Sequence, residues 1–202
     1  MHHYRFLTLC TAAGILGVAA AGFACAGPLD AQYCGAVPAA GFDRAPNRAH
    51  TGRYVNGVYG YAVSIPPGFI GYSSAHGPQR GFGIVLSWAP RAYLSVDAAY
   101  DAFYDITADG VHRRDVVGVR LFDTLVSDQK TAGALAHDPG GRYLMRVRCP
   151  GSAQVYIHDE VIVMRRREIY RVELQTVPSR YASDVKILEA MLPTWEWVGV
   201  QH

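Results

Sequence analysis

The stretch from Glu168 to Val198 constrains the fold more than any other part of this sequence. Tyr170, Val172 and Leu174 alternate with polar residues at a period of two, which predicts a half-buried strand. After a short turn, apolar residues at three-and-four spacing predict an amphipathic helix that Pro193 ends. These residues are Tyr181, Val185, Leu188, Met191 and Leu192. We therefore expect the helix to fold back over the apolar face of the strand.

Short strands and one helix are predicted in the first half of the chain. Asn56-Gly57 is a turn signal between two short flanking strands, and the alternation over 61–65 predicts a strand that two prolines end. The apolar run 83–88 predicts another strand. Ser95 is then expected to cap a helix over 95–106, because the apolar residues there recur at helical spacing.

The second half is predicted to be an antiparallel meander. The valines of 116–126 favour a strand, and Ser127–Lys130 is expected to be a turn into the next strand. Alternation over 142–149 and the apolar run 155–164 predict two further strands joined by short turns. These elements together predict an α+β fold with an antiparallel sheet of about six strands covered by helices. Trp195 and Trp197 are expected to seal one edge of its core.

The N-terminus has the features of a secretory signal. A basic flank precedes a run of roughly 18 apolar residues, and Ala24-Cys25-Ala26 fits the small-residue cleavage site of a signal peptidase. We predict a signal peptide over 1–26, an extended arm or linker over 27–53 and a single domain over 54–202. An uncleaved membrane anchor and a lipoprotein acylated at Cys25 remain alternatives. The expected location is periplasmic or secreted.

Charge and cysteine content narrow the partners and the compartment. Without the signal, 18 basic and 17 acidic residues leave a net charge of about +1, which gives no basis for nucleic-acid binding. Cys34 and Cys149 are then the two remaining cysteines, and in an oxidising compartment we expect them to form a disulfide.

Arginines cluster in the predicted meander and are the candidate partner-binding residues. Their alternation places several of them on the outward face of a strand, where guanidinium groups favour carboxylates and phosphates. A basic face of this kind could dock an acidic protein surface or lipid headgroups. The alternative is a solvated face on which they pair with glutamates of neighbouring strands. The candidates are Arg142, Arg146, Arg148, Arg166 and Arg171.

Two weaker patterns could carry chemistry. Ser127 and Lys130 have the spacing by which a lysine activates a serine on a helix, but they fall in a predicted turn. His158 and Glu160 share a strand face and could supply two zinc ligands, although no third ligand is marked. We therefore predict no catalytic residue, no metal and no cofactor.

Three segments of this sequence resemble the PsbP-like and DcrB-like family of secreted or envelope proteins. They are YGYAVSIPPGF, the LSW run before Ser95, and the closing IYRVELQTVPSRY to WEWV. The resemblance spans 54–198 and implies an antiparallel sheet between helices, with no shared catalytic residues to carry over. It implies a non-enzymatic periplasmic or envelope protein that binds a protein partner. An immunity protein that neutralises an interbacterial toxin and a small envelope hydrolase are the alternative hypotheses.

Overall fold

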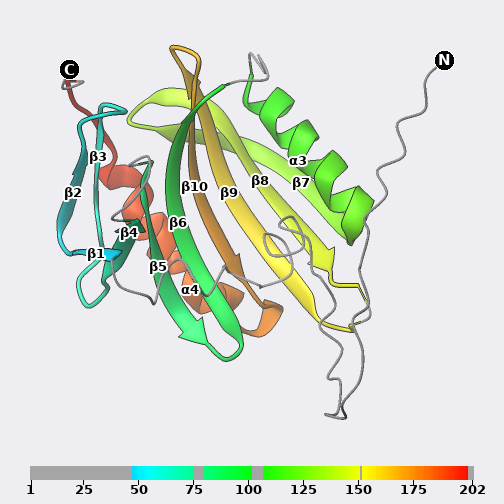
Figure 1. The fold of residues 1–202 in the computed structure, drawn as a ribbon. Helices are drawn as coiled ribbons and strands as arrows, with labels where there is room; N and C mark the ends of the chain where they lie inside the picture. The colour runs from blue at the N-terminus through cyan, green and yellow to red at the C-terminus, as the bar shows by residue number, and fades with distance from the viewer. Residues whose placement is uncertain (1–46, 75–79, 102–106, 151, 200–202) are drawn as a thin grey trace, which may run out of the picture.

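Two antiparallel sheets and two α-helices make up the part of the chain that the computed structural model describes, residues 47–74, 80–101, 107–150 and 152–199 (Figure 1). The large sheet has the strand order β1-β4-β5-β6-β10-β9-β8-β7, and the small sheet the order β11-β3-β2. The elements are β1 (Asn47–His50), β2 (Arg53–Asn56), β3 (Tyr61–Ser64), β4 (Gly71–Ser74), β5 (Phe82–Trp88), β6 (Arg91–Tyr100), α3 (Ala108–Phe122), β7 (Thr124–Leu135), β8 (Asp138–Arg148), β9 (Val155–Arg165), β10 (Glu168–Thr176), α4 (Pro178–Met191), a 3-10 turn (Leu192–Thr194) and β11 (Glu196–Trp197). The predicted α+β class is confirmed, but the large sheet has eight strands rather than about six.

Helix α4 covers one face of the large sheet, as the closing stretch of the sequence predicts. Val172 and Leu174 of β10 are no more than 1 % exposed and belong to the same apolar cluster as Leu188 and Met191 of α4. The small sheet extends this cluster, and Trp195 stacks on a tyrosine of β3 at 4.5 Å between ring centroids. The main core therefore lies between the large sheet on one side and α4 with the small sheet on the other.

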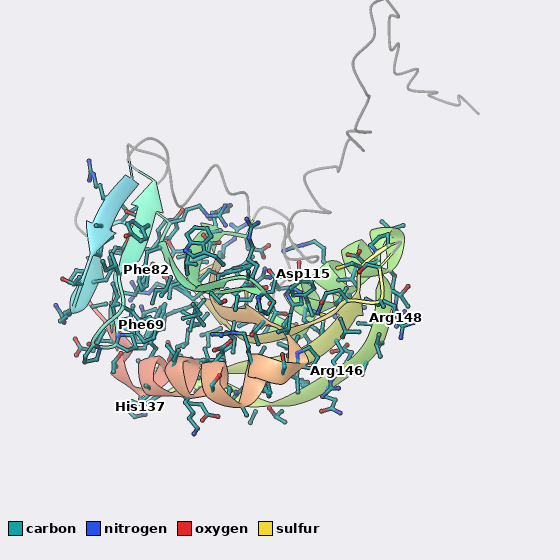
Figure 2. All side chains as sticks on the ribbon, turned by 90° about the horizontal axis from the view of Figure 1, so that it is seen from below. Phe69, Phe82, Asp115, His137, Arg146 and Arg148 are labelled. Atoms are coloured by element: carbon teal, nitrogen blue, oxygen red, sulfur yellow. The ribbon has the colours of Figure 1, made fainter. Side chains whose placement is uncertain are left out.

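Helix α3 covers part of the opposite face, over β7, β8 and β9 (Figures 1 and 2). Val119 packs against Met145 and Val147, and Val111 packs against Tyr143. These three β8 residues alternate with the arginines of the same strand, as the sequence predicts. The apolar clusters under α3 are much smaller than the main core, and most other contacts there are between charged groups.

The helix predicted over 95–106 is wrong for its described part, because 95–100 belong to β6. Ala92, Leu94, Val96 and Ala98 are all buried, which is the period of two expected for a strand. β6 lies between β5 and β10 inside the large sheet, so both of its edges are hydrogen-bonded. Alanines at several positions made the helical and strand patterns hard to separate in the sequence.

The strand predicted over 116–126 is wrong for 116–122, which belong to α3, whereas 124–126 begin β7. Thr107 caps this helix by accepting a hydrogen bond from the Gly110 amide at 3.1 Å. The weak preference of valine for strands is overridden by burial of one helical face against the sheet. Ser127–Lys130 is not a turn, since it lies inside β7.

Smaller differences concern the first strands and the ends of the chain. The Asn56 side chain accepts hydrogen bonds from the amides of Val58 and Tyr59, so the hairpin turn runs to the start of β3. β1 pairs with β4, so the large sheet begins inside the predicted arm over 27–53. The predicted signal peptide and its cleavage site lie outside the described residues, as does Cys34. Among the described residues, no helix has the length and apolar character needed to cross a bilayer.

Candidate functional site

The candidate arginines do not form one surface. Arg142 lies on the face that α4 covers, and its Nε and Nη2 donate to Asp159 at 2.8 and 2.7 Å. Asp159 is fully buried, and Tyr181 of α4 also donates to it at 2.7 Å. Arg142 therefore neutralises a buried carboxylate at which α4 is anchored.

Arg171 lies on the opposite face of the sheet, beneath α3. It forms an ion pair with Asp115 of α3, and its Nε lies 3.3 Å from Glu160. The expected common face of Arg142 and Arg171 is therefore wrong. The strand register explains this, because Arg171 is paired with Ile162, whereas Arg142 is paired with Val161 one residue away.

The remaining three candidates are exposed, but Arg166 lies far from the other two. Arg146 and Arg148 lie near the end of β8, at the end of the molecule away from the small sheet (Figure 2). Arg166 is in the turn after β9, whose length of 11 residues corresponds to about 33 Å. Whether any of them binds a partner stays a prediction.

A layer of charged side chains lies between α3 and the sheet, and His112 is at its centre. Its Nδ1 lies 3.0 Å from Glu160, its Nε2 lies 3.0 Å from Asp128, and its ring stacks on Tyr143 at 3.9 Å. Burial alone would lower the pKa of His112, but the hydrogen bonds to Glu160 and Asp128 raise it above its usual value. When protonated, the ring donates to two carboxylates from different strands.

The same layer contains a second contact between a histidine and a carboxylate, between strands β9 and β10. His158 is fully buried, and its Nδ1 lies 2.8 Å from Glu173. Burial opposes ionisation of Glu173, but the contacts with His158 and Arg171 lower its pKa below the usual range. We refer to these groups together as the ionic layer: His112, Asp115, Asp128, His158, Glu160, Arg171 and Glu173.

The serine and lysine of the hydrolase hypothesis cannot act together. Ser127 is paired with Arg146, on the α4 face, whereas Lys130 is paired with Tyr143, on the α3 face. Lys130 instead contacts Asp109 of α3 at 2.6 Å. Three residues along a strand place two side chains on opposite faces, which a helix would not. In the described part of the chain, no three His, Cys, Asp or Glu residues are grouped as metal ligands would be.

A pocket of about 250 Å³ opens at the edge of the ionic layer, between α3 and strands β6 and β10. Arg80 forms an ion pair with Asp97 in this pocket, and Arg171 forms the ion pair with Asp115 described above. Its complete lining is Arg80, Asp97, Ala99, Tyr100, Arg114, Asp115, Ile169 and Arg171. We call it the ionic pocket.

The outer surface of α3 carries two exposed apolar side chains between arginines. Val117 is 58 % exposed and Leu121 is 71 % exposed. Arg113 and Arg120 are exposed on the same side of the helix, since they lie four residues before Val117 and three after it. We call Arg113, Val117, Arg120 and Leu121 the outer stripe of α3. The sequence does not reveal it, because the valines in the second half of this helix favour a strand.

The structure describes only one of the two cysteines that are predicted to form a disulfide. Cys149 follows β8 directly and is 9 % exposed. Cys34 lies outside the described residues, so their pairing stays a prediction.

Comparison with known proteins finds no matching family model and no matching curated protein. Solved structures similar to this chain include the PsbP protein of the cyanobacterium Synechocystis sp. PCC 6803, at 16 % identity and a TM-score of 0.49 over 74 % of this chain and 92 % of that one. A protein of unknown function from Pseudomonas aeruginosa, PA94, is 12 % identical with a TM-score of 0.41 over 64 % and 92 % of the two chains. LpqN of Mycobacterium tuberculosis, described as involved in cell envelope biogenesis, is 8 % identical with a TM-score of 0.37 over 77 % and 87 %. A PsbP protein is thus among the similar structures. At this level of similarity no function is assigned from it.

Proposed function

We propose that this protein is a non-enzymatic interaction protein of the cell envelope, and that it binds a protein partner through the outer stripe of α3. The observation that carries the proposal is the exposure of Val117 and Leu121 one helical turn apart. Neighbouring large apolar side chains on a helix surface are typical anchors for a partner's groove. The inner side of the same helix contacts the ionic layer, so its outer side is directed away from the sheet.

The charge of the outer stripe indicates the chemistry of the partner. Arg113 and Arg120 flank the two apolar side chains and are both exposed. The first-turn Asp109 is paired with Lys130, and Asp115 is paired with Arg171 beneath the helix. A partner surface with an apolar groove between carboxylates would complement this stripe, and its charges would also speed association.

The sequence of the first 26 residues and the two remaining cysteines support the proposed location in the envelope. A secretory signal would carry the chain into an oxidising compartment, where a disulfide between Cys34 and Cys149 is stable. The toxin-neutralising immunity protein is one specific version of this proposal. It stays a prediction, since it requires a particular partner.

A non-enzymatic role is favoured over the hydrolase alternative by the placement of its proposed residues. The side chains of Ser127 and Lys130 lie on opposite faces of the sheet. His112 and His158 each contact a buried glutamate, Glu160 and Glu173 respectively. The binding of a partner therefore accounts for the exposed groups better than a reaction does.

The experiment is capture and identification of the partner from an envelope extract, followed by titration with purified proteins. The variant Val117→Gln/Leu121→Gln should weaken binding by at least tenfold, because each apolar side chain that becomes buried contributes about 1.5 kcal/mol or more. Val58→Gln is the matched control, since Val58 is 56 % exposed on the distant β2–β3 hairpin. Equal binding by all three proteins would reject the outer stripe as the interface. The same proteins are also tested for binding to anionic phospholipid vesicles. If no protein is captured, and the wild type binds the vesicles while the double variant does not, the outer stripe contacts a membrane surface instead.

A further inference from the structure

Strand β7 forms one edge of the large sheet. Among the described strands it pairs only with β8, and it is 12 residues long (Figure 1). The strand at the other edge, β1, has 4 residues. A long edge strand offers unpaired backbone N–H and C=O groups to a further strand. In the described part of the chain, β7 is therefore the place at which the large sheet can be extended.

The turn between β7 and β8 determines which residues offer these groups. Ala136 and His137 form a two-residue turn with φ values of 45° and 75°. Leu135 and Asp138 are the paired residues next to it. In a hairpin of this kind the pair next to the turn is hydrogen-bonded, and so is every second pair after it. The odd-numbered residues of 127–135 therefore bond to β8, and the backbone groups of the even-numbered residues point outward.

Two of the even-numbered residues of β7 carry opposite charges. Asp128 lies on the α3 face of the sheet, where it contacts His112 at 3.0 Å. Lys130 lies on the same face and contacts Asp109 at 2.6 Å. The side chains of Asp128 and Lys130 remain 33 % and 54 % exposed. An ammonium group has three donors and a carboxylate about four lone-pair sites, so each can take a second partner without losing the first.

The charges of β7 select one register for antiparallel pairing with a second copy of the same strand. A two-fold axis at Asp128 or at Lys130 would place two like charges opposite each other, which destabilises a sheet. An axis at Gln129 instead places Asp128 of each copy opposite Lys130 of the other, so that two ion pairs can form. An axis at Thr131 would leave Lys130 opposite Ala132, without an ion pair. The register centred on Gln129 is therefore the most favourable of the four.

We propose that this protein forms a two-fold symmetric homodimer in which the β7 strands of two copies pair antiparallel around Gln129. The two large sheets then join into one continuous sheet, with Asp128 and Lys130 paired across the junction. Val126, which is 47 % exposed at the bulge in β7, comes to lie opposite Ala132 of the other copy. This edge is separate from the outer stripe of α3, so the dimer does not depend on the proposed partner.

The first experiment measures dimerisation by sedimentation velocity over a concentration series of the purified protein. The wild type should dimerise reversibly. Lys130→Glu should raise the Kd of the dimer at least tenfold, because it replaces both ion pairs by repulsion between carboxylates. Lys186→Glu is the matched control, since the same charge change on the exposed side of α4 should leave the Kd unchanged. A wild type that stays monomeric at every concentration would overturn the proposal and leave the edge to a strand of another protein. A Kd that Lys130→Glu does not alter would overturn it as well.

The second experiment tests the register by cysteine cross-linking under mild oxidation, with the wild type as the baseline for the natural cysteines. The Gln129 residues of the two copies would face each other with Cβ atoms about 4.5 to 5.5 Å apart, so Gln129→Cys should give a covalent dimer. Thr131→Cys is the matched control, because Thr131 is exposed on the same face but would lie about 13 Å from its counterpart. It should not cross-link. Cross-linking through Thr131→Cys, or none through Gln129→Cys, would overturn the proposed pairing.

Discussion

His112 of α3 and Glu160 of β9 are joined at 3.0 Å between Nδ1 and Oε1, with both side chains almost completely buried. This contact connects the helix to a central strand of the large sheet through charge rather than through apolar packing. It also makes the attachment of α3 dependent on the protonation of one imidazole.

The stability of the protein should therefore fall as the pH rises past neutrality. The folded state raises the pKa of His112, so its contribution is complete below the unfolded value of about 6.5 and is lost as the pH passes through the higher folded value. His112→Gln should cost about 2 kcal/mol at pH 6, because a charged hydrogen bond to buried Glu160 is lost. Thermal unfolding from pH 5.5 to 9 measures this. The stability curves of the wild type and of His112→Gln should converge toward high pH. Parallel curves would contradict this role of His112.

We expect Arg142 to stabilise the fold, whereas Arg146 on the same strand should contribute little to stability. Arg142→Ala leaves fully buried Asp159 without its guanidinium, which should cost about 3 kcal/mol. Arg146→Ala, two residues along, should change the stability by less than about 0.5 kcal/mol, because Arg146 is exposed. Urea denaturation of both variants distinguishes them. Similar midpoints would show that the Asp159 contact contributes little.

Two glycines should respond in opposite directions to alanine. A Cβ at Gly118 in α3 would have no atom within 4 Å, so Gly118→Ala should stabilise the protein by up to about 1 kcal/mol through helix propensity. A Cβ at Gly81 would lie 1.8 Å from the carbonyl oxygen of Val96, so Gly81→Ala should displace the backbone and destabilise the fold severely. Melting temperatures of the pair test this, and a loss of stability in Gly118→Ala would mean that α3 is not packed as described.

The cysteine pairing can be tested by mass mapping without reduction. A peptide linking Cys34 to Cys149 is expected, and Cys149→Ser should lower the stability by at most about 4 to 5 kcal/mol, because the closed loop exceeds a hundred residues. Cys34→Ser should lower it by a similar amount if the bond is the cause. Free thiols at both positions in the purified protein would reject the disulfide.

The closing strand and helix could be predicted from the sequence because two strong periodicities adjoin each other there. The alternation in β10 and the stripe of α4 both point to one apolar core, and Pro193 marks the end of the helix. The alternation in β8 was equally clear. Local pattern and tertiary burial agree in each of these elements.

The middle of the chain could not be predicted because its local patterns are ambiguous. Alanines in β6 satisfy both helical and strand spacing, and valines in α3 favour a strand unless the sheet is already present to bury them. The ionic layer was hidden for the same reason, since His112 was not recognised as part of a helix. The opposite orientations of Arg142 and Arg171 depend on strand register, which a single strand's pattern cannot provide.

The two helices are attached by different forces, and this has a consequence for local opening. Helix α4 packs on the main apolar core, whereas α3 rests on small apolar clusters and on ion pairs that salt and pH can weaken. Amide hydrogens of α3 should thus exchange with solvent deuterium well before those of α4, and more so in concentrated salt or at alkaline pH. Helix α3 would then unfold locally while the large sheet and α4 stay folded.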